Sequence, residues 1–170
     1  RPIDLHIMGM KALGARVTVE EGYVVAEADQ LVGADIHLDI ASVGATGNIL
    51  MAAVAARGTT RILNAAREPE IPALAGFLVA QGASIQGAGT GEITIEGGRP
   101  LRPAPARIIA DRIEVGTYLV AGAMTAGDVT ITHARPDHVQ AVLAKLQQLG
   151  AQVTVDGESI RVVGPARPTP

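Results

Sequence analysis

One short pattern occurs three times along the chain at constant spacing, and it constrains the fold more than any other feature of the sequence. In each copy a run of helix-forming residues ends at a glycine that is followed by an alanine, at Gly14, Gly82 and Gly150. Successive glycines are 68 residues apart in both intervals (82 − 14 and 150 − 82). A regular period indicates that one structural unit is copied along the chain.

Each of these glycines is expected to end an amphipathic helix, because glycine readily adopts the positive φ that a helix C-terminus needs. The third helix shows the pattern most clearly, with Val139, Val142, Leu143 and Leu146 on one stripe. After each glycine, alternating apolar and polar residues predict two strands and a sheet with one buried face. The predicted strand pairs are 16–20 with 23–27, 84–86 with 92–96, and 152–155 with 159–163.

A second kind of helix is predicted over residues 46–56 and 117–126, which are apolar almost all round and rich in alanine and glycine. A helix without a polar face is expected to be buried on every side. A strand follows each one, at 59–64 and 128–133. The repeated unit therefore reads strand, buried helix, strand, amphipathic helix, strand, strand, and it predicts an α/β (α+β) fold with helices inside and sheets outside.

The composition excludes several classes of function. The net charge is -3 and only three residues are aromatic, so neither a basic surface nor a stacking platform for nucleic acid is expected. The longest uninterrupted apolar run, 49–56, is too short to span a membrane. There is no cysteine, and the four histidines lack the spacing of metal ligands, so no metal site is predicted.

A segment rich in proline and glycine, residues 97–105, interrupts the repeat. We predict a lobe boundary near residue 110. Residues 1–110 would then form about two units of one lobe, and residues 111–170 one unit of a second lobe. The chain begins without an initiator methionine or a targeting pattern and ends in a linker-like Pro165–Pro170, so we expect an internal piece of a longer protein.

Three polar stretches each have two interpretations. Ser42 precedes the first buried helix and is either an ordinary cap, which the spacing alone favours, or part of an anion site. Glu68 and Glu70 begin the middle amphipathic helix and either face a substrate or complement the helix dipole, the better-supported interpretation from spacing. Asp111 and Glu114 begin the second buried helix and either contact a ligand at the lobe junction or serve in capping.

The glycine-rich residues 87–91 have a superficial likeness to a dinucleotide-binding loop. They lie between two predicted strands rather than between a strand and a helix. We therefore interpret them as a hairpin turn.

Four stretches in this order resemble the UDP-N-acetylglucosamine 1-carboxyvinyltransferases of the enolpyruvyl transferase family, and the resemblance covers essentially all 170 residues. They are Arg1–His6, Ser42–Ile49, Asn64–Ile71 and Asp111–Thr117. The resemblance implies two lobes, each an inside-out α/β barrel of three units. It also implies transfer of the enolpyruvyl group of phosphoenolpyruvate to the 3′-hydroxyl of UDP-N-acetylglucosamine. That reaction is the first committed step of peptidoglycan synthesis, and it implies a cytoplasmic enzyme that needs no cofactor.

The resemblance also implies roles for particular residues. Those matching the uridine-lining stretch are Arg1, Pro2, Ile3, Asp4 and Leu5, with Arg1 also near phosphate groups. Those matching the turn that holds the UDP part are Ile40, Ala41, Ser42, Val43 and Gly44, although the first two are apolar where relatives often carry a polar or basic residue. The carboxylates with supporting catalytic roles are Glu68, Glu70, Asp111 and Glu114.

The chain lacks the cysteine that serves the family as general acid, and it lacks the later lobe with its base and phosphate-binding arginines. We therefore expect the isolated chain to be inactive although its parent is active. Three alternatives stay open at this point: the shikimate-pathway enolpyruvyl transferase, a non-catalytic nucleotide-sugar binding module, and a purely structural repeat protein.

Overall fold

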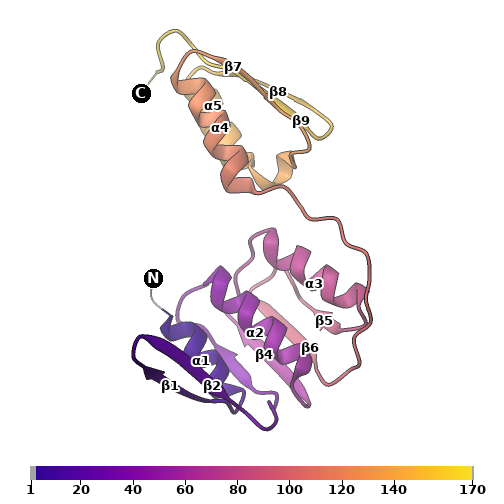
Figure 1. The fold of residues 1–170 in the computed structure, drawn as a ribbon. Helices are drawn as coiled ribbons and strands as arrows, with labels where there is room; N and C mark the ends of the chain where they lie inside the picture. The colour runs from indigo at the N-terminus through magenta and orange to yellow at the C-terminus, as the bar shows by residue number, and fades with distance from the viewer. Residues whose placement is uncertain (1–2, 170) are drawn as a thin grey trace. The chain divides into compact units, whose positions relative to one another are not determined.

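The structure is a computed structural model that describes residues 3–169. The chain divides into two compact units, Arg1–Arg107 and Ile108–Pro170 (Figure 1). Both combine helices with β-sheets, which confirms the predicted mixed α/β class.

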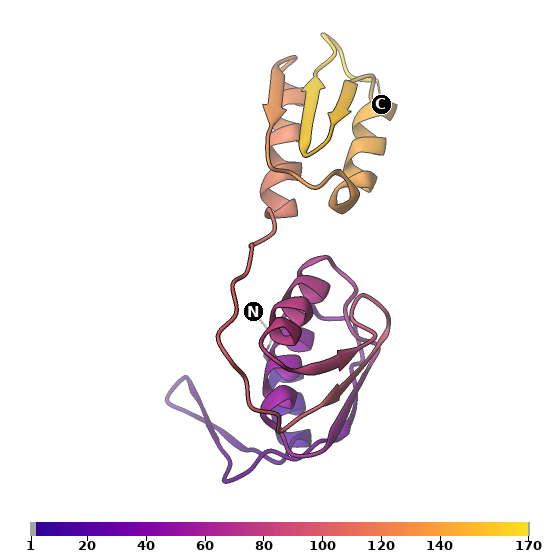
Figure 2. The ribbon, with the colours of Figure 1, turned by 90° about the vertical axis from the view of Figure 1, so that its right-hand side faces the viewer.

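The first unit has one hairpin and one larger sheet. Its elements are α1 (Asp4–Ala12), β1 (Arg16–Glu20), β2 (Tyr23–Glu27), β3 (Asp35–His37), α2 (Val43–Ala55), β4 (Thr59–Leu63), α3 (Glu70–Ala80), β5 (Ser84–Gln86) and β6 (Glu92–Glu96). Strands β1 and β2 form an antiparallel hairpin, and the larger sheet has the order β3-β4-β6-β5, with only the β3–β4 pair parallel. Helices α2 and α3 pack on the same face of the larger sheet (Figure 2).

The second unit repeats part of this arrangement. Its elements are α4 (Arg112–Met124), β7 (Asp128–Ile131), the 3-10 helix η1 (Pro136–His138), α5 (Gln140–Gln148), β8 (Gln152–Asp156) and β9 (Ser159–Val163). The sheet order β7-β9-β8 is antiparallel throughout and corresponds to β4-β6-β5 of the first unit. Helices α4 and α5 contact this sheet as α2 and α3 contact theirs.

The repeat is confirmed in the hydrogen bonds that end three helices. Gly14, Gly82 and Gly150 all have positive φ, at 95°, 112° and 90°. After each glycine, the alanine N–H donates to the carbonyl five residues earlier: Ala15 to Met10, Ala83 to Leu78 and Ala151 to Leu146, each at 3.0 Å. Each glycine N–H donates to the carbonyl three residues earlier, which completes the same Schellman motif in all three copies.

The predicted strands and the predicted hairpin turn are also confirmed. The three strand pairs form the antiparallel ladders β1–β2, β5–β6 and β8–β9. Residues 87–91 connect β5 to β6, with Gly87 and Gly89 at positive φ. They form a turn between strands, as the sequence predicts.

The core of the first unit lies between α2 and the larger sheet, and the core of the second unit lies between α4 and its sheet. In the first unit Ile49 and Leu50 of α2 are fully buried against Ile62, Ile93 and Ile95 of the sheet. In the second unit the fully buried residues include Leu119 of α4 with Ile160 and Val162 of β9. The positions of β4, β6 and β9 that face the core are thus occupied by β-branched residues, which pack well on a pleated surface.

The prediction that both apolar helices are buried on every side is wrong for this chain. Helix α2 has one exposed stripe that includes Met51, at 47% exposure. Helix α4 is more open, with Ile113 at 61%, Tyr118 at 58% and Met124 at 73% exposure. The reason is the number of neighbouring helices within each unit, because α2 packs against both α1 and α3, whereas α4 packs mainly against α5 among the helices of residues 3–169.

The prediction of one buried face per sheet is wrong for the β1–β2 hairpin. Every residue of β2 is exposed, and in β1 only Val17 is buried. The positions equivalent by register to Ile93 and Ile95 are Val24 and Ala26, because Glu27 and Glu96 occupy matching places in their ladders. Ile93 and Ile95 are fully buried beneath α2, whereas no helix of residues 3–169 covers Val24 and Ala26 in the same way.

The sheets of residues 3–169 have two, four and three strands, and none is closed on itself. A barrel is therefore not formed within this part of the chain. Among the described residues no helix has the length and hydropathy that a membrane span requires.

Candidate functional site

The first turn of α2 is built to leave backbone N–H groups available. Ser42 is extended, at φ -91° and ψ 120°, and its Oγ accepts a hydrogen bond from the N–H of Ala45 at 3.3 Å. The serine therefore caps the helix, as the favoured interpretation predicts. The N–H groups of Val43 and Gly44 have no partner inside the helix, and with the helix dipole they make this end attractive to an anion.

The start of α1 lies beside this turn. Nδ1 of His6 is 2.7 Å from Nδ2 of Asn48, one turn into α2. The two helices approach closely because Gly9 is buried against Ile49, where any larger residue would overlap the isoleucine side chain. The stretch that begins α1 and the stretch that begins α2, which are predicted separately, are thus brought together.

The loop before α3 is attached to the same turn. The buried hydroxyl of Thr46 accepts a hydrogen bond from the N–H of Ala66 at 3.0 Å. Asn64 adopts a positive φ of 57° and donates from Nδ2 to the Leu38 carbonyl at 2.8 Å, which fixes the bend where β4 leaves the sheet. The residues that follow this bend therefore begin next to the first turn of α2.

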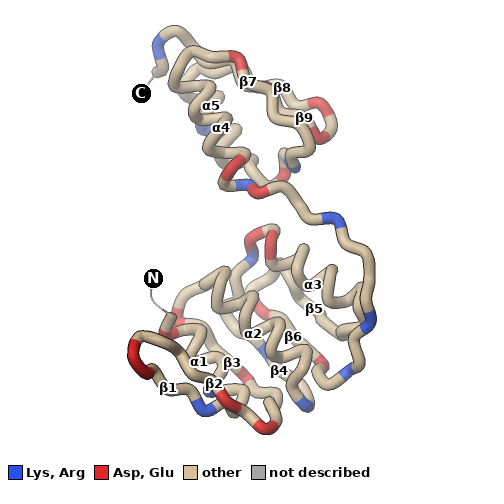
Figure 3. Tube along the Cα trace, in the orientation of Figure 1, with Lys and Arg blue, Asp and Glu red and all other residues tan. Residues whose placement is uncertain are grey.

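The two carboxylates of this loop have local roles. Oε2 of Glu68 accepts a hydrogen bond from the N–H of Arg67 at 3.0 Å. Glu70 lies in the first turn of α3, where its charge complements the dipole. Figure 3 shows acidic and basic segments together at the start of α3.

The structure places the other sequence-predicted residues of the first unit around these elements. Ile3 is exposed and precedes α1, Asp4 lies in its first turn, and Leu5 packs against the core. Ile40 and Ala41 are both exposed just before Ser42, and Ile40 is 67% exposed. Arg1 and Pro2 were also predicted to bind substrate, and they lie outside the described residues.

In the second unit, Asp111 is the N-cap of α4. Its Oδ1 accepts hydrogen bonds from the N–H groups of Ile113 and Glu114, at 2.7 and 3.3 Å. Glu114 lies exposed in the first turn of α4. The capping role proposed for Asp111 is therefore present, and any role in ligand binding stays a prediction.

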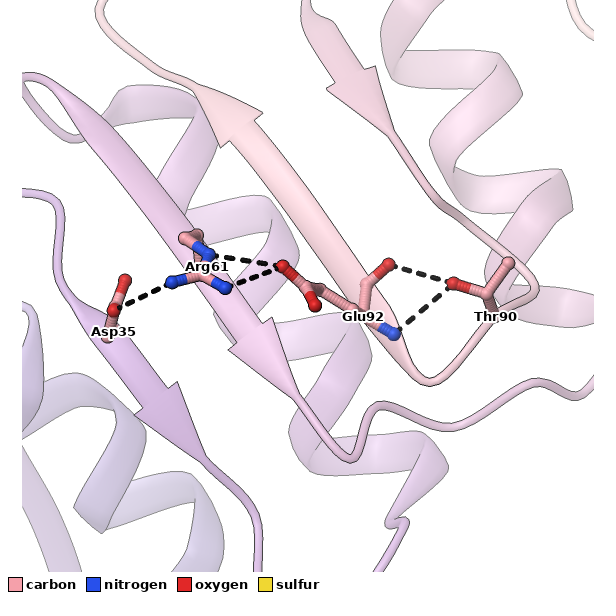
Figure 4. A network of polar contacts seen from close by, with 4 residues as sticks. All are labelled: Asp35, Arg61, Thr90 and Glu92. Carbon is pink, nitrogen blue, oxygen red and sulfur yellow. Dashed lines mark hydrogen bonds and ion pairs between the residues drawn. The ribbon is translucent and has the colours of Figure 1, made fainter.

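Charged side chains also form pairs on the outer faces of the sheets, away from the helices. Arg61 donates to Oε1 of Glu92 at 2.8 and 3.1 Å and to Oδ2 of Asp35 at 3.1 Å, and it thus joins β6, β4 and β3 (Figure 4). Hydrogen bonds to Glu92, together with the charges of Glu92 and Asp35, raise the pKa of Arg61. Thr90 closes the adjoining turn by hydrogen bonding the backbone of Glu92.

The second unit has a similar pair, in which Arg161 of β9 binds Asp128 of β7. The hydrogen bonds from Arg161 lower the pKa of Asp128. These exposed cross-strand pairs are interpreted as determinants of strand register rather than as sites. No cluster of three or more histidine, aspartate or glutamate residues that could hold a metal ion occurs within residues 3–169.

Four polar residues of the site region were not identified as functional from the sequence: His6, Thr46, Asn48 and Asn64. Each makes a hydrogen bond to a residue that is 20 or more positions away in sequence. Position Asn48 does have a local signal, since it lies four residues after Gly44 and so one turn further along the same helix face. The partner of each residue becomes evident only in the folded chain.

The arrangement of helices and sheets matches the fold of solved enolpyruvyl transferases. An enolpyruvyl transferase from Streptomyces tendae, NikO, matches 98% of this chain with a TM-score of 0.82 and 24% sequence identity, over 43% of its own length. EPSP synthase from Acinetobacter baumannii matches 96% of the chain with a TM-score of 0.71 and 25% identity, over 40% of its length. At such low identity the first of these likenesses shows the fold alone.

The chain belongs to the family described as EPSP synthase (3-phosphoshikimate 1-carboxyvinyltransferase), which it matches over residues 1–170. Within that family it is 54% identical over 164 residues to a UDP-N-acetylglucosamine 1-carboxyvinyltransferase of Desulfosudis oleivorans. It is 53% identical to an enzyme of the same name from Caldanaerobacter subterraneus and 51% identical to one from Acidobacterium capsulatum. These alignments cover 95–96% of the chain, but the chain spans only about two fifths (37–40%) of the length of these relatives.

Proposed function

We propose that this chain is part of an enzyme that transfers the enolpyruvyl group of phosphoenolpyruvate to the 3′-hydroxyl of UDP-N-acetylglucosamine, with release of phosphate. The observation that carries the proposal is the identity of 51–54% to enzymes named for carboxyvinyl transfer to UDP-N-acetylglucosamine. The approach of the two predicted substrate stretches to each other, and of the loop that precedes the catalytic carboxylates Glu68 and Glu70, at the first turns of α2 supports it. The proposed product belongs to peptidoglycan synthesis, which takes place in the cytoplasm at this step.

The UDP part is assigned to the starts of α1 and α2. The free N–H groups of Val43 and Gly44 suit the negative charge of a diphosphate. In this proposal the residues from Arg1 to Leu5 line the uridine, and Ile40 to Gly44 hold the nucleotide. Because Ile40 and Ala41 have no polar side-chain group, binding at that point depends on the backbone and on Ser42.

The four carboxylates are assigned supporting catalytic roles. Addition of a hydroxyl to the enol carbon gives that carbon positive character, and fixed negative charges stabilise it. Glu68 and Glu70 follow shortly after Ala66, whose N–H is bonded to Thr46 in the first turn of α2. Asp111 and Glu114 supply carboxylates from the start of α4. Proton transfer needs a general acid, and the 170 residues contain no cysteine for it.

We further propose that the units complete an inside-out barrel in the whole protein, with helices inside. The exposed apolar side chains of α4 support this, and so does Val24 of the β1–β2 hairpin, because its equivalent by register, Ile93, is fully buried beneath α2. An open apolar pocket of about 250 Å³ between α1 and the hairpin has Ile7, Met10 and Val24 in its wall. Such surfaces are expected where further copies of the unit pack. The lobe division near residue 110 belongs to the same proposal.

A coupled phosphate-release assay tests the proposed function. The complete gene product that contains these residues is expected to release phosphate only when phosphoenolpyruvate and UDP-N-acetylglucosamine are both present. The isolated 170-residue chain is expected to release none. Turnover by the isolated chain at the rate of the complete protein would contradict the proposal. Phosphate release that requires neither phosphoenolpyruvate nor UDP-N-acetylglucosamine would also contradict it.

The family description favours one alternative, transfer to 3-phosphoshikimate. The same assay separates the two, with shikimate 3-phosphate in place of the nucleotide sugar. Phosphate release with shikimate 3-phosphate alone supports the alternative. Tight binding of UDP-N-acetylglucosamine without turnover in the complete gene product indicates a binding module instead.

A further inference from the structure

His6 links the two helix starts that are assigned to the nucleotide sugar. It is half-buried in α1, and its Nδ1 lies 2.7 Å from Nδ2 of Asn48 in α2. An amide nitrogen can only donate, so Nδ1 of His6 is the acceptor in this contact. The bond therefore fixes the orientation of the ring.

The other edge of the ring lies against the first turn of α2. A Cβ atom placed on Gly44 would be 3.1 Å from Cε1 and 3.2 Å from Nε2 of His6. These separations are shorter than ordinary van der Waals contact. Gly44 has no unusual φ that requires glycine, so the close histidine is a physical reason for glycine at this position.

From these contacts we propose that His6 is a positioning residue for the UDP-sugar site. Held by Asn48 and packed on Gly44, it sets the distance between the stretch that precedes α1 and the N–H groups that begin α2. One ligand that contacts both stretches requires this distance to be fixed before binding. The inference rests on the proposed function, because it assigns His6 to the same site.

Three variants at position 6 separate positioning from direct contact. His6→Asn keeps an acceptor at the place of Nδ1, so it can retain the bond to Asn48. His6→Gln instead keeps a polar group near the place of Nε2, and His6→Ala removes both. His37, which is exposed on β3 of the same unit, provides a matched control as His37→Asn.

The measurement is steady-state kinetics of the complete gene product, with KM for UDP-N-acetylglucosamine and kcat determined separately. His6→Ala is expected to raise this KM about tenfold, as for loss of one partly buried hydrogen bond, with kcat changed less than about threefold. His6→Asn is expected to restore most of the affinity. His6→Gln is expected to resemble His6→Ala, and His37→Asn is expected to resemble the unmodified protein. Restoration by His6→Gln rather than His6→Asn, or an unchanged KM in His6→Ala, overturns the inference.

A double-mutant cycle with Gly44→Ala gives a second, independent readout. If the histidine ring is what limits the space at position 44, the added methyl is expected to raise KM several-fold less in the His6→Ala background than in the unmodified protein. An equal effect in both backgrounds contradicts the proposed packing. An unmodified protein that is folded but neither binds nor turns over the nucleotide sugar refutes the proposed function itself, which distinguishes that failure from failure of the role of His6.

Discussion

The end of α2 packs on the end of β6 so closely that one added methyl group is expected to disrupt it. A Cβ atom on Gly97 would overlap the carbonyl oxygens of Ala53 and Ala56, which are backbone atoms and cannot rotate away. Two hydrogen bonds hold the same junction, from the N–H of Gly97 to Gly58 at 2.9 Å and from the N–H of Gly98 to Val54 at 3.0 Å. Gly97→Ala therefore forces the strand and the helix apart.

The expected cost follows from these contacts. Overpacking of a well-packed site costs about 1–3 kcal/mol. Weakening of the two hydrogen bonds adds about 1 kcal/mol each at most, so the total lies between about 1 and 5 kcal/mol, with about 3 kcal/mol as the central value. A loss of this size is a large fraction of the 5–15 kcal/mol that stabilises a typical domain.

The assay is native-state hydrogen exchange of the 170-residue chain, with Ile95 as reporter of the first unit and Ile160 as reporter of the second. Gly97→Ala is expected to lower the free energy of opening at Ile95 and to leave Ile160 unchanged. The matched control is Gly76→Ala in α3, where no atom lies within 4 Å of the added Cβ and helix propensity predicts a gain of about 0.5–1 kcal/mol. A change at Ile95 below about 1 kcal/mol in Gly97→Ala would refute the close packing of α2 on β6.

Three further predictions concern other parts of the chain. In urea unfolding, Gly14→Ala is expected to lower the free energy of unfolding by about 1–2 kcal/mol because the φ of Gly14 is 95°, and Gly14→Asn is expected to lower it less. Equal free energies of unfolding for these two variants and the unmodified protein would contradict the shared helix-ending motif. Leu119→Ala in α4 is expected to cost about 2–5 kcal/mol, whereas Ile113→Ala, 61% exposed in the same helix, costs under about 1 kcal/mol; similar losses would mean that α4 presents a different face to its sheet. Asp128 is expected to titrate below its ordinary pKa of 3.8. Its contribution to stability is therefore present above pH 3.8 and is lost as the pH falls through the lower pKa of the folded state. Carbon-detected NMR measures this pKa, and the same titration midpoint in Arg161→Met would contradict the role of the arginine.

Much of the local structure could be predicted from the sequence because local rules determine it. Glycines with constant spacing end three helices with the same hydrogen bonds, since few other residues adopt positive φ at low cost. The strand pairs follow from alternating side chains and from their turns. The cap at Ser42 is likewise a local interaction, between residues three positions apart.

Burial was predicted less well because it depends on neighbours that a helix sequence does not specify. The compositions of α2 and α4 both favour burial on every side, but only α2 lies between two other helices of its unit. The site is affected in the same way. The hydroxyl of Thr46 and the side chains of His6 and Asn48 are ordinary in sequence, and their roles arise from contacts between distant segments.

We have proposed that the first turn of α2 holds the diphosphate of UDP-N-acetylglucosamine. A crystal structure of the complete gene product with this ligand would show where the diphosphate binds. We expect diphosphate oxygens within hydrogen-bonding distance of the N–H groups of Val43 and Gly44, with the uridine beside the start of α1. A diphosphate bound elsewhere, with both N–H groups turned to solvent, would contradict the assignment of the site.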